Sequence, residues 1–358
     1  MLDFGCVIEI IFTFDAMKLF RFLLFPFAIA YDIITTVRNK FFDIGILKST
    51  SFNIPVIAVG NLSVGGTGKS PQIEYLIRLL KEHYRVAVLS RGYKRKTKGF
   101  QVVNANHSAK DVGDEPLQFY KKFKNEVTVA VDADRTNGIE ELLKRKVAPQ
   151  IVLLDDAYQH RKVKASHYIL LTKYDDLYTD DFILPVGNLR EGKRGADRAN
   201  IIVVTKCPED LSEIRKQEVR NKIRLKANQQ LFFTIISYDE NLKGTDLELT
   251  VSDLKEKEVL LVTGIANPNS LLQFLDKNEI NYKHLKYPDH YDFTESDINK
   301  IEKEFQELPQ LNKIIVTTEK DYMRLEGKVE NVSYISIKSE FLHEGELFDE
   351  LIVNSINR

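Results

Sequence analysis

The chain has 358 residues, enough for two ordinary domains or for one large domain and a smaller one. Its 43% hydrophobic and 29% charged residues are typical of a folded globular protein and exclude a largely disordered one. The net charge of −1 excludes a general polyanion binder, so we expect no nucleic-acid partner, and any basic site must be local. The two cysteines, Cys6 and Cys207, are too few for a disulfide framework or a cysteine metal site.

An apolar segment lies near the N-terminus, from Phe22 to Tyr31. It is shorter than the roughly 20 apolar residues that a spanning helix needs, and it contains Pro26. Three interpretations remain, namely a cleaved signal peptide, a buried structural helix and a helix that lies on a membrane surface. We favour the third because cations flank the segment where phospholipid headgroups would lie: Lys18, Arg21, Arg38 and Lys40.

From residue 51 onward, short apolar runs alternate with segments of helical spacing. The runs predict buried strands at 54–59, 85–89, 127–131, 151–154, 168–171 and 201–204. Between the first two, apolar residues on one face predict a helix over 71–83. Strands that are apolar throughout are typical of a parallel sheet with helices on both faces. Ligands bind at the carboxyl ends of such strands.

The pattern changes near residue 240. A polar stretch over 238–248 predicts a linker, and apolar runs at 259–262 and 314–316 predict strands of a second α/β domain. We therefore expect an N-terminal membrane-associated segment (1–50), a domain with a P-loop NTPase-type sheet (51–238) and a smaller C-terminal α/β domain (239–358). Residues 1–16 precede a second methionine, Met17, and carry no prediction.

A glycine-rich loop follows the first predicted strand and reads Ser63-Val64-Gly65-Gly66-Thr67-Gly68-Lys69-Ser70. Its glycines allow backbone N–H groups to point at phosphate oxygens, and the following helix adds its positive end. Lys69 would bind the β and γ phosphates, and the Ser70 hydroxyl would bind Mg²⁺. Ser63 replaces the glycine of the strict P-loop pattern, so this loop is a variant. A glycine-rich turn with a surface lysine is the alternative.

Acidic residues end the fourth predicted strand, at Asp155 and Asp156. A P-loop enzyme needs a carboxylate at such a place to complete the Mg²⁺ environment, so we predict metal binding by at least one of them. The alternative is an ordinary turn at the end of a strand. Gln159 and His160 follow closely and are expected to line the same site.

A basic loop follows the second strand and holds five cations, among them Arg91, Lys94 and Arg95. It is either a solvated loop or a clamp for an anionic acceptor, such as a phosphorylated substrate or a lipid headgroup. Farther along, Asp114 and Glu115 precede a proline. They either cap a helix or supply a general base for an acceptor hydroxyl.

Taken together, these motifs resemble the tetraacyldisaccharide 4′-kinase family, which phosphorylates a lipid A precursor. The matching segments follow one another in the family's order: 59–71, 89–93, 112–116, 155–160, 184–191, 264–268, 287–290 and 318–321. Eight motifs in register make the resemblance specific. The chain departs from the family at Ser70, where many members have threonine, and at Ala157, where a glycine is usual. The basic run Gly192-Lys193-Arg194-Gly195 has no role that we can assign.

The resemblance implies an ATP-dependent lipid sugar kinase with Mg²⁺ as cofactor. Its acceptor would be the 4′-hydroxyl of a tetraacylated glucosamine disaccharide 1-phosphate, at the cytoplasmic face of a bacterial inner membrane, with no protein partner. It implies that Asp114 is the base, that His290 orients Asp114 or raises its basicity, and that Lys69 assists transfer. It places Arg190 and Glu191 near the nucleotide, and it makes Arg91, Lys94, Arg95, Gln159 and His160 candidates for substrate contacts.

The rival hypothesis is a membrane-associated P-loop ATPase of the partitioning or targeting type. Such proteins have a similar glycine-rich loop and also use amphipathic helices, but they act as switches and transfer the phosphoryl group to water. Phosphorylation of a lipid acceptor distinguishes the kinase from this switch.

Overall fold

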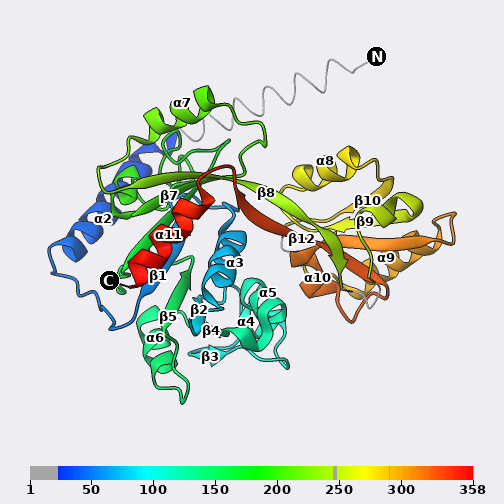
Figure 1. Cartoon of the computed structure of the whole chain (residues 1–358), viewed down its shortest axis with the longest axis horizontal. Helices are drawn as coiled ribbons and strands as arrows, with labels where there is room; N and C mark the ends of the chain where they lie inside the picture. Colours follow the sequence, from blue (N-terminus) through cyan, green and yellow to red (C-terminus); the bar gives the residue numbers. More distant parts are fainter. Residues whose placement is uncertain (1–22, 245–247, 290, 358) are drawn as a thin grey trace. The chain divides into compact units, whose positions relative to one another are not determined.

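The computed structural model describes residues 23–244, 248–289 and 291–357 (Figure 1). These residues form two compact units, and the chain passes from one to the other after Lys69, Lys146, Ile235 and Glu340. The first unit holds the described residues up to Lys69, Val147–Ile235 and the segment from Phe341 onward. The second holds Ser70–Lys146 and the described part of Ile236–Glu340.

The first unit is built on a parallel sheet of apolar strands. In spatial order its neighbours are β5 (Ile151–Asp155), β1 (Val56–Asn61), β6 (His167–Lys173), β7 (Ile201–Thr205) and the start of β8 (Gln230–Lys243). Every residue of β1, β5 and β7 is buried, which is expected for strands covered on both faces. The carboxyl ends of these parallel strands therefore lie on one edge, where β1 and β5 both end in polar residues.

Helical segments of the first unit are α2 (Phe25–Asp43), the 3₁₀ helix η2 (Lys193–Arg198), α7 (Glu213–Ile223) and α11 (Gly345–Ile356). A core cluster joins η2 and α7 to the sheet, with Leu170, Ile202 and Val204 in one cluster with Val219 and Ile223 of α7. The close approach of β1 to the turn after β5 needs a glycine at position 60, because a Cβ there would lie 2.7 Å from the Cβ of Tyr158.

The second unit begins within α3 (Lys69–Leu80). In its first part β2 (Val86–Ser90) pairs in parallel with β4 (Thr128–Val131), and β3 (Gln101–Val102) pairs antiparallel to β4. The accompanying helices are α4 (Ala109–Val112), α5 (Asp114–Phe123), the 3₁₀ turn η1 (Lys124–Glu126) and α6 (Arg135–Leu143). The apolar face of α3 is buried as the sequence predicts, at Ile73, Leu76, Ile77 and Leu80.

The later part of the second unit contains β9 (Glu258–Thr263), which pairs in parallel with β10 (Tyr282–Lys286) and with β11 (Lys313–Thr318). Next, β12 (Val332–Phe341) pairs in parallel with β11. The helical segments are η3 (Ser252–Glu256), α8 (Asn269–Lys277), α9 (Glu295–Gln306) and α10 (Glu319–Leu325). Leu254, Leu261, Leu275 and Val316 belong to one buried cluster.

The predicted α/β class is confirmed, and each predicted strand and the predicted helix coincide with an observed element. The predicted linker is wrong at its start, because β8 continues through Tyr238 to Lys243. The later residues of β8 are mostly partly buried or exposed. Such positions accept polar side chains, and these gave the sequence the polar pattern that predicted a linker. The predicted domain boundaries stay predictions.

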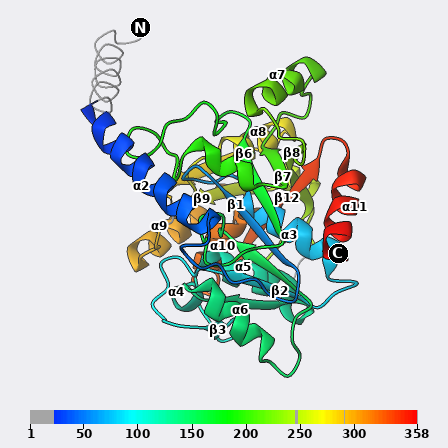
Figure 2. The ribbon, with the colours of Figure 1, turned by 90° about the vertical axis from the view of Figure 1, so that its left-hand side faces the viewer.

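Helix α2 is a long helix (Figure 2), and many of its apolar side chains are exposed. Of its side chains only Ala28 and Thr35 are buried, so the interpretation as a buried structural helix is wrong. Large apolar side chains are exposed instead, with Phe27 at 66%, Ile33 at 58% and Ile34 at 65%. Pro26 lies in the first turn, where a missing N–H costs nothing. In the part of the chain that the structure describes, every helix falls short of the combined length and apolar character that a membrane span requires.

A buried ion triad joins three helices of the second unit. The Lys122 ammonium on α5 lies 2.6 Å from a Glu74 oxygen on α3 and 3.0 Å from a Glu319 oxygen on α10. Both carboxylates are at most 4% exposed, and Gln118 donates to Glu74 at 3.0 Å. Burial, followed by the Glu74 charge, raises the pKa of Glu319 to about 7, although Lys122 and Lys243 oppose the shift. Lys122 therefore forms ion pairs with two buried carboxylates. Because the pKa of Glu319 is raised, Glu319 takes up a proton more readily than an exposed glutamate does.

We predict that Gly60→Ala lowers the free energy of unfolding by about 1–3 kcal/mol, because the new methyl group would overlap Tyr158, whose backbone nitrogen lies 3.0 Å from that position. Urea denaturation followed by circular dichroism measures the change. The matched control is Gly345→Ala, at the first residue of α11, where the nearest atom would be at 3.4 Å. We expect the control to be neutral or slightly stabilising. Equal unfolding midpoints for the two variants would contradict the packing argument.

We also predict a pH dependence of stability that comes from Glu319. Its folded-state pKa of about 7 lies above the ordinary 4.5, so the folded state binds this proton more tightly. The free energy of unfolding should therefore fall as the pH rises from about 4.5 to about 7, and stay reduced above it.

Glu319→Gln should remove this part of the slope, by on the order of 1–3 kcal/mol across the window. Buried Asp321 also has a raised pKa and contributes a slope of the same sign, so the quantity to compare is the difference between variant and wild type. Urea midpoints at a series of pH values measure it. Parallel curves for the two proteins would refute the assignment to Glu319.

Candidate functional site

The glycine-rich loop leads from the end of β1 into α3, which begins at Lys69. Gly65 and Gly68 have positive φ angles of 104° and 83°, so the loop curls in a way that L side chains disfavour. A Cβ at Gly65 or Gly66 would have open space around it. The loop therefore leaves room for a ligand in front of its backbone, at the positive end of a helix.

A neighbouring segment holds the loop in place. The Val64 N–H donates to the Asn188 carbonyl at 2.8 Å, and the Arg190 N–H donates to the Leu62 carbonyl at 2.7 Å. The Thr205 hydroxyl, at the end of β7, donates to the Thr67 carbonyl at 2.9 Å. The loop and the segment that carries Arg190 thus form one backbone-bonded surface.

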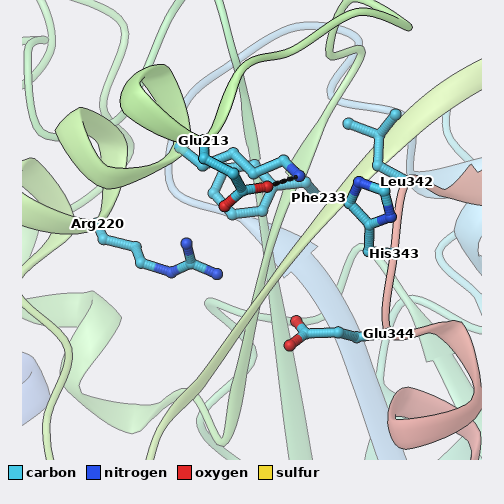
Figure 3. A pocket seen from close by; sticks show the side chains of 7 residues that line it. Glu213, Arg220, Phe233, Leu342, His343 and Glu344 are labelled. Carbon is cyan, nitrogen blue, oxygen red and sulfur yellow. Dashed lines mark hydrogen bonds and ion pairs between the residues drawn. The ribbon is translucent and has the colours of Figure 1, made fainter.

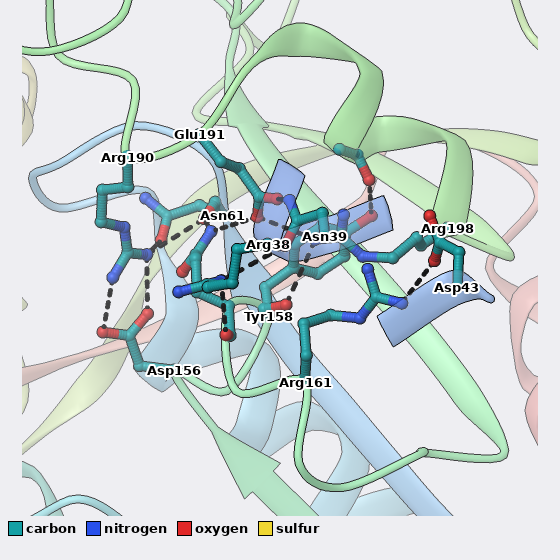
Figure 4. Close-up of polar contacts among 12 residues, drawn as sticks. Arg38, Asn39, Asp43, Asn61, Asp156, Tyr158, Arg161, Arg190, Glu191 and Arg198 are labelled. Carbon is teal, nitrogen blue, oxygen red and sulfur yellow. Dashed lines mark hydrogen bonds and ion pairs between the residues drawn. The ribbon is translucent and has the colours of Figure 1, made fainter. Parts of the chain in front are cut away.

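Two cations converge on one carboxylate beside the loop, and Figure 4 shows one of them, Arg190, in contact with Asp156. The Arg190 guanidinium donates to both oxygens of Asp156, at 2.8 and 3.1 Å, and the Lys69 ammonium lies 3.6 Å from the same carboxylate. Lys69 and Arg190 also donate to the Asn61 side-chain oxygen, Lys69 at 3.2 Å. Asp156 has a φ of 47°, a strained conformation that aims its side chain at these cations.

Glu191 is the centre of a buried polar network (Figure 4). Its carboxylate accepts from Arg198 at 2.8 Å, from the Gln159 amide at 3.0 Å and from the Asn39 amide of α2 at 2.7 Å. The Gln159 amide also donates to the Asn61 carbonyl at 2.9 Å. Glu191 and Gln159 are therefore engaged in supporting the loop, and their predicted contacts with nucleotide and substrate stay predictions.

Mg²⁺ prefers hard oxygen ligands, and it usually binds one or two carboxylates together with substrate phosphates. Asp155, buried at the end of β5, and Asp156 provide such oxygens in the first unit. In the second unit, the Ser70 hydroxyl donates a hydrogen bond to a Glu115 carboxylate oxygen at 2.7 Å. The lone pairs of the Ser70 oxygen therefore remain available to a cation. Oxygen donors of the kind that Mg²⁺ prefers are thus present among the predicted residues of each unit, and their binding of a metal stays a prediction.

The predicted base, Asp114, is the first residue of α5 and forms an ion pair with Arg324 of α10. The Arg324 side chain is only 6% exposed and also lies 3.4 Å from Asp321. Asp321 accepts from the Gly264 N–H at 2.8 Å and from the Thr318 hydroxyl at 2.7 Å. Burial raises the pKa of Asp321. Arg324 thus links the Asp114 carboxylate to a rigid, hydrogen-bonded turn.

The remaining predicted residues differ in their surroundings. Arg91 and Lys94 of the basic loop are exposed, whereas Arg95 donates to the Gly99 carbonyl at 2.6 Å and folds back on its own loop. His160 is partly buried. His290 lies outside the described residues.

Sequence reasoning missed Asn61 and Arg324 as site residues, and it considered Glu115 only together with Asp114, as a helix cap or a general base, not as a partner of Ser70. Asn61 lies inside the recognised motif, next to the loop it supports, so its position was available as a signal. The Ser70–Glu115 and Arg324–Asp114 contacts join residues 45 and 210 positions apart, and nothing local in the sequence marks them.

Comparison with known proteins shows which family the chain resembles over its length. A model of the tetraacyldisaccharide-1-P 4′-kinase family matches residues 20–357. The tetraacyldisaccharide 4′-kinase of Flavobacterium johnsoniae is 55% identical, over 95% of this chain and 98% of its own. That of Bacteroides thetaiotaomicron is 45% identical, over 84% and 82%. The crystal structure of LpxK from Aquifex aeolicus in complex with ATP is 34% identical and superposes with a TM-score of 0.75, over 94% and 99%.

These matches favour the kinase over the partitioning-type ATPase switch, because they extend over nearly the whole chain and not over the P-loop alone. The chain belongs to the tetraacyldisaccharide-1-P 4′-kinase family.

Proposed function

We propose that this chain transfers the γ-phosphoryl group of ATP to the 4′-hydroxyl of a tetraacyl glucosamine disaccharide 1-phosphate, a step of lipid A synthesis. The observation that carries the proposal is the P-loop geometry at Lys69 in a chain that belongs to this family. The bond from phosphorus to the sugar oxygen forms while the bond to the ADP oxygen breaks, and the hydroxyl proton leaves for a base.

The glycine-rich loop, the start of α3 and Arg190 would bind the nucleotide. The N–H groups of the loop Ser63–Ser70 and the start of α3 would meet the phosphates. Lys69 is already held beside the loop by Asn61 and Asp156, so it is placed to neutralise the charge that develops on the phosphoryl group. Arg190 is the second cation of this kind.

Mg²⁺ would be held by Ser70 and by Asp155 or Asp156, and it would supply charge neutralisation at the β and γ phosphates. The protein provides few ligands of its own, which suits a cation that arrives with the nucleotide. The hydrogen bond from Ser70 to Glu115 would orient the hydroxyl for this contact.

Residues of the second unit would handle the acceptor. Asp114 would accept the proton of the 4′-hydroxyl, and His290 would orient it. Arg324 restricts the Asp114 side chain, which favours one productive rotamer. Exposed Arg91 and Lys94 are the candidates for the 1-phosphate of the acceptor, since their charges are open to a ligand.

The acceptor is a lipid, so the enzyme must work at a membrane surface. The exposed apolar side chains of α2 fit a helix that lies in the interface, with its polar contacts turned to the folded unit: Tyr31 to Arg190, Arg38 to Gln159 and Asp43 to Arg161. These contacts favour a retained helix over a cleaved signal. We therefore propose peripheral attachment at the cytoplasmic face of the inner membrane, where ATP is present.

Lys69→Ala should reduce the turnover of lipid phosphorylation by on the order of 10²–10³, because a preorganised cation at the phosphoryl group is lost. ADP release is measured with Mg-ATP, with and without the acceptor lipid. The control is Lys144→Ala, a lysine whose side chain is 68% exposed, and it should keep full turnover. If Lys69→Ala kept near-normal turnover, the site would be misassigned. ADP release in wild type that does not depend on lipid would favour the switch ATPase.

Asp114→Asn should abolish lipid phosphorylation but keep ATP binding, because asparagine retains the shape of the side chain and cannot take the hydroxyl proton. Radiolabelled phosphate transfer measures the reaction, and calorimetric titration measures ATP affinity. The control Glu302→Gln changes an exposed carboxylate on α9 and should change neither. Unchanged transfer by Asp114→Asn would exclude Asp114 as the base.

A further inference from the structure

The first unit contains a pocket, apart from the candidate site, that has no role in the proposed reaction. It has a volume of 710 Å³ and lies among the loop after β6, the 3₁₀ helix η2 and the end of α7. Its lining includes the run Lys193-Arg194, for which the sequence suggested no function, together with Lys222 and Arg224. We call these residues and their surroundings the η2–α7 pocket.

The η2–α7 pocket has an excess of positive charge. Its four cations face two carboxylates, Asp180 and Asp197. Each carboxylate is already paired with a lysine, Asp180 with Lys222 at 2.7 Å and Asp197 with Lys226 at 2.8 Å. Within the described part of the chain, the exposed guanidinium groups of Arg194 and Arg224 form no ion pair.

A structural explanation covers only part of this charge. Arg220 and Lys222 lie in the last turn of α7, where cations complement the negative end of the helix. Arg194 comes from η2, a different element, and adds its charge to the same pocket.

The neighbouring pocket gives a useful contrast (Figure 3). It measures 150 Å³, and its Lys216 is paired with Glu213 at 2.6 Å. Its Arg220 lies over the Phe233 ring, with the guanidinium carbon 5.4 Å from the ring centroid, and Glu344 also lines the pocket. Charges are balanced there, so the positive excess belongs to the η2–α7 pocket and not to α7 as a whole.

The η2–α7 pocket borders the apolar surface of α2. Lys193 donates to the Thr179 carbonyl at 2.5 Å, and its ammonium lies 5.8 Å from the centroid of the Phe182 ring. The Phe182 ring in turn packs edge-on against Phe25 of α2 at 6.2 Å, and 54% of Phe182 remains exposed. The cations of the pocket and the exposed apolar side chains of α2 thus lie beside each other, with Phe182 between them.

A surface of this kind matches a molecule with a phosphate at one end and hydrocarbon at the other. We propose that the η2–α7 pocket binds the phosphate headgroup of an anionic bilayer phospholipid while the exposed side chains of α2 enter the acyl region. Arg194 and Arg224 are the principal phosphate contacts. This role goes beyond the kinase reaction, because it needs neither ATP nor the acceptor.

The test measures binding of the full chain to sedimenting vesicles of phosphatidylcholine, with or without phosphatidylglycerol. A cation near an anionic surface contributes about 1 kcal/mol, so Arg194→Gln with Arg224→Gln should weaken binding to the anionic vesicles by about 30-fold. Binding to pure phosphatidylcholine should not change. The matched control, Arg215→Gln with Arg220→Gln, removes the same charge from α7 outside the pocket and should retain most of the affinity.

Equal losses in the two double variants would overturn the proposal in favour of a general charge effect, and so would unchanged binding of the pocket variant. Displacement from the vesicles by millimolar-scale glycerol 1-phosphate would assign the pocket to a soluble phosphate and would also overturn it. Turnover on detergent-dispersed acceptor separates this idea from the kinase proposal. It should be unchanged in the pocket variant, and a loss there would assign the pocket to the acceptor.

Discussion

The Asp156 carboxylate, shared by Lys69 and Arg190, is the interaction on which the candidate site depends. Two cations so close together would repel each other and move away from the loop without a counter-charge. Asp156 supplies it, and Asn61 adds a neutral acceptor for both. The loop therefore keeps its cations in place before a polyanionic ligand arrives, and less reorganisation is needed when it binds.

The same network connects the loop to the N-terminal helix. Asn39 of α2 donates to Glu191, Gln159 donates to Glu191 and to the Asn61 carbonyl, and Asn61 holds Lys69. Glu191 is nearly inaccessible to water, so its loss would leave Arg198 buried without its charge partner. The helix with the exposed apolar surface is thus part of the polar support of the candidate site.

Much of this architecture could be predicted from the sequence, because local patterns encode it. Apolar runs predicted the strands. The loop from Ser63 to Ser70 was recognisable from its glycine-rich composition and from the predicted strand and helix on either side. The linker near Tyr238 was misjudged because the partly exposed strand β8 has a polar pattern. Contacts such as Arg324 to Asp114, or Lys122 to both Glu74 and Glu319, depend on tertiary packing. No local sequence pattern predicts them.

The central claim is that the phosphoryl group of ATP ends on a lipid sugar hydroxyl. The most direct measurement is a phosphorus–proton correlation NMR spectrum of the lipid recovered after incubation of the purified chain with Mg-ATP and tetraacyldisaccharide 1-phosphate. We predict a second phosphomonoester signal, correlated with the proton on the 4′ carbon. Recovery of unmodified lipid together with ADP and inorganic phosphate would contradict the account.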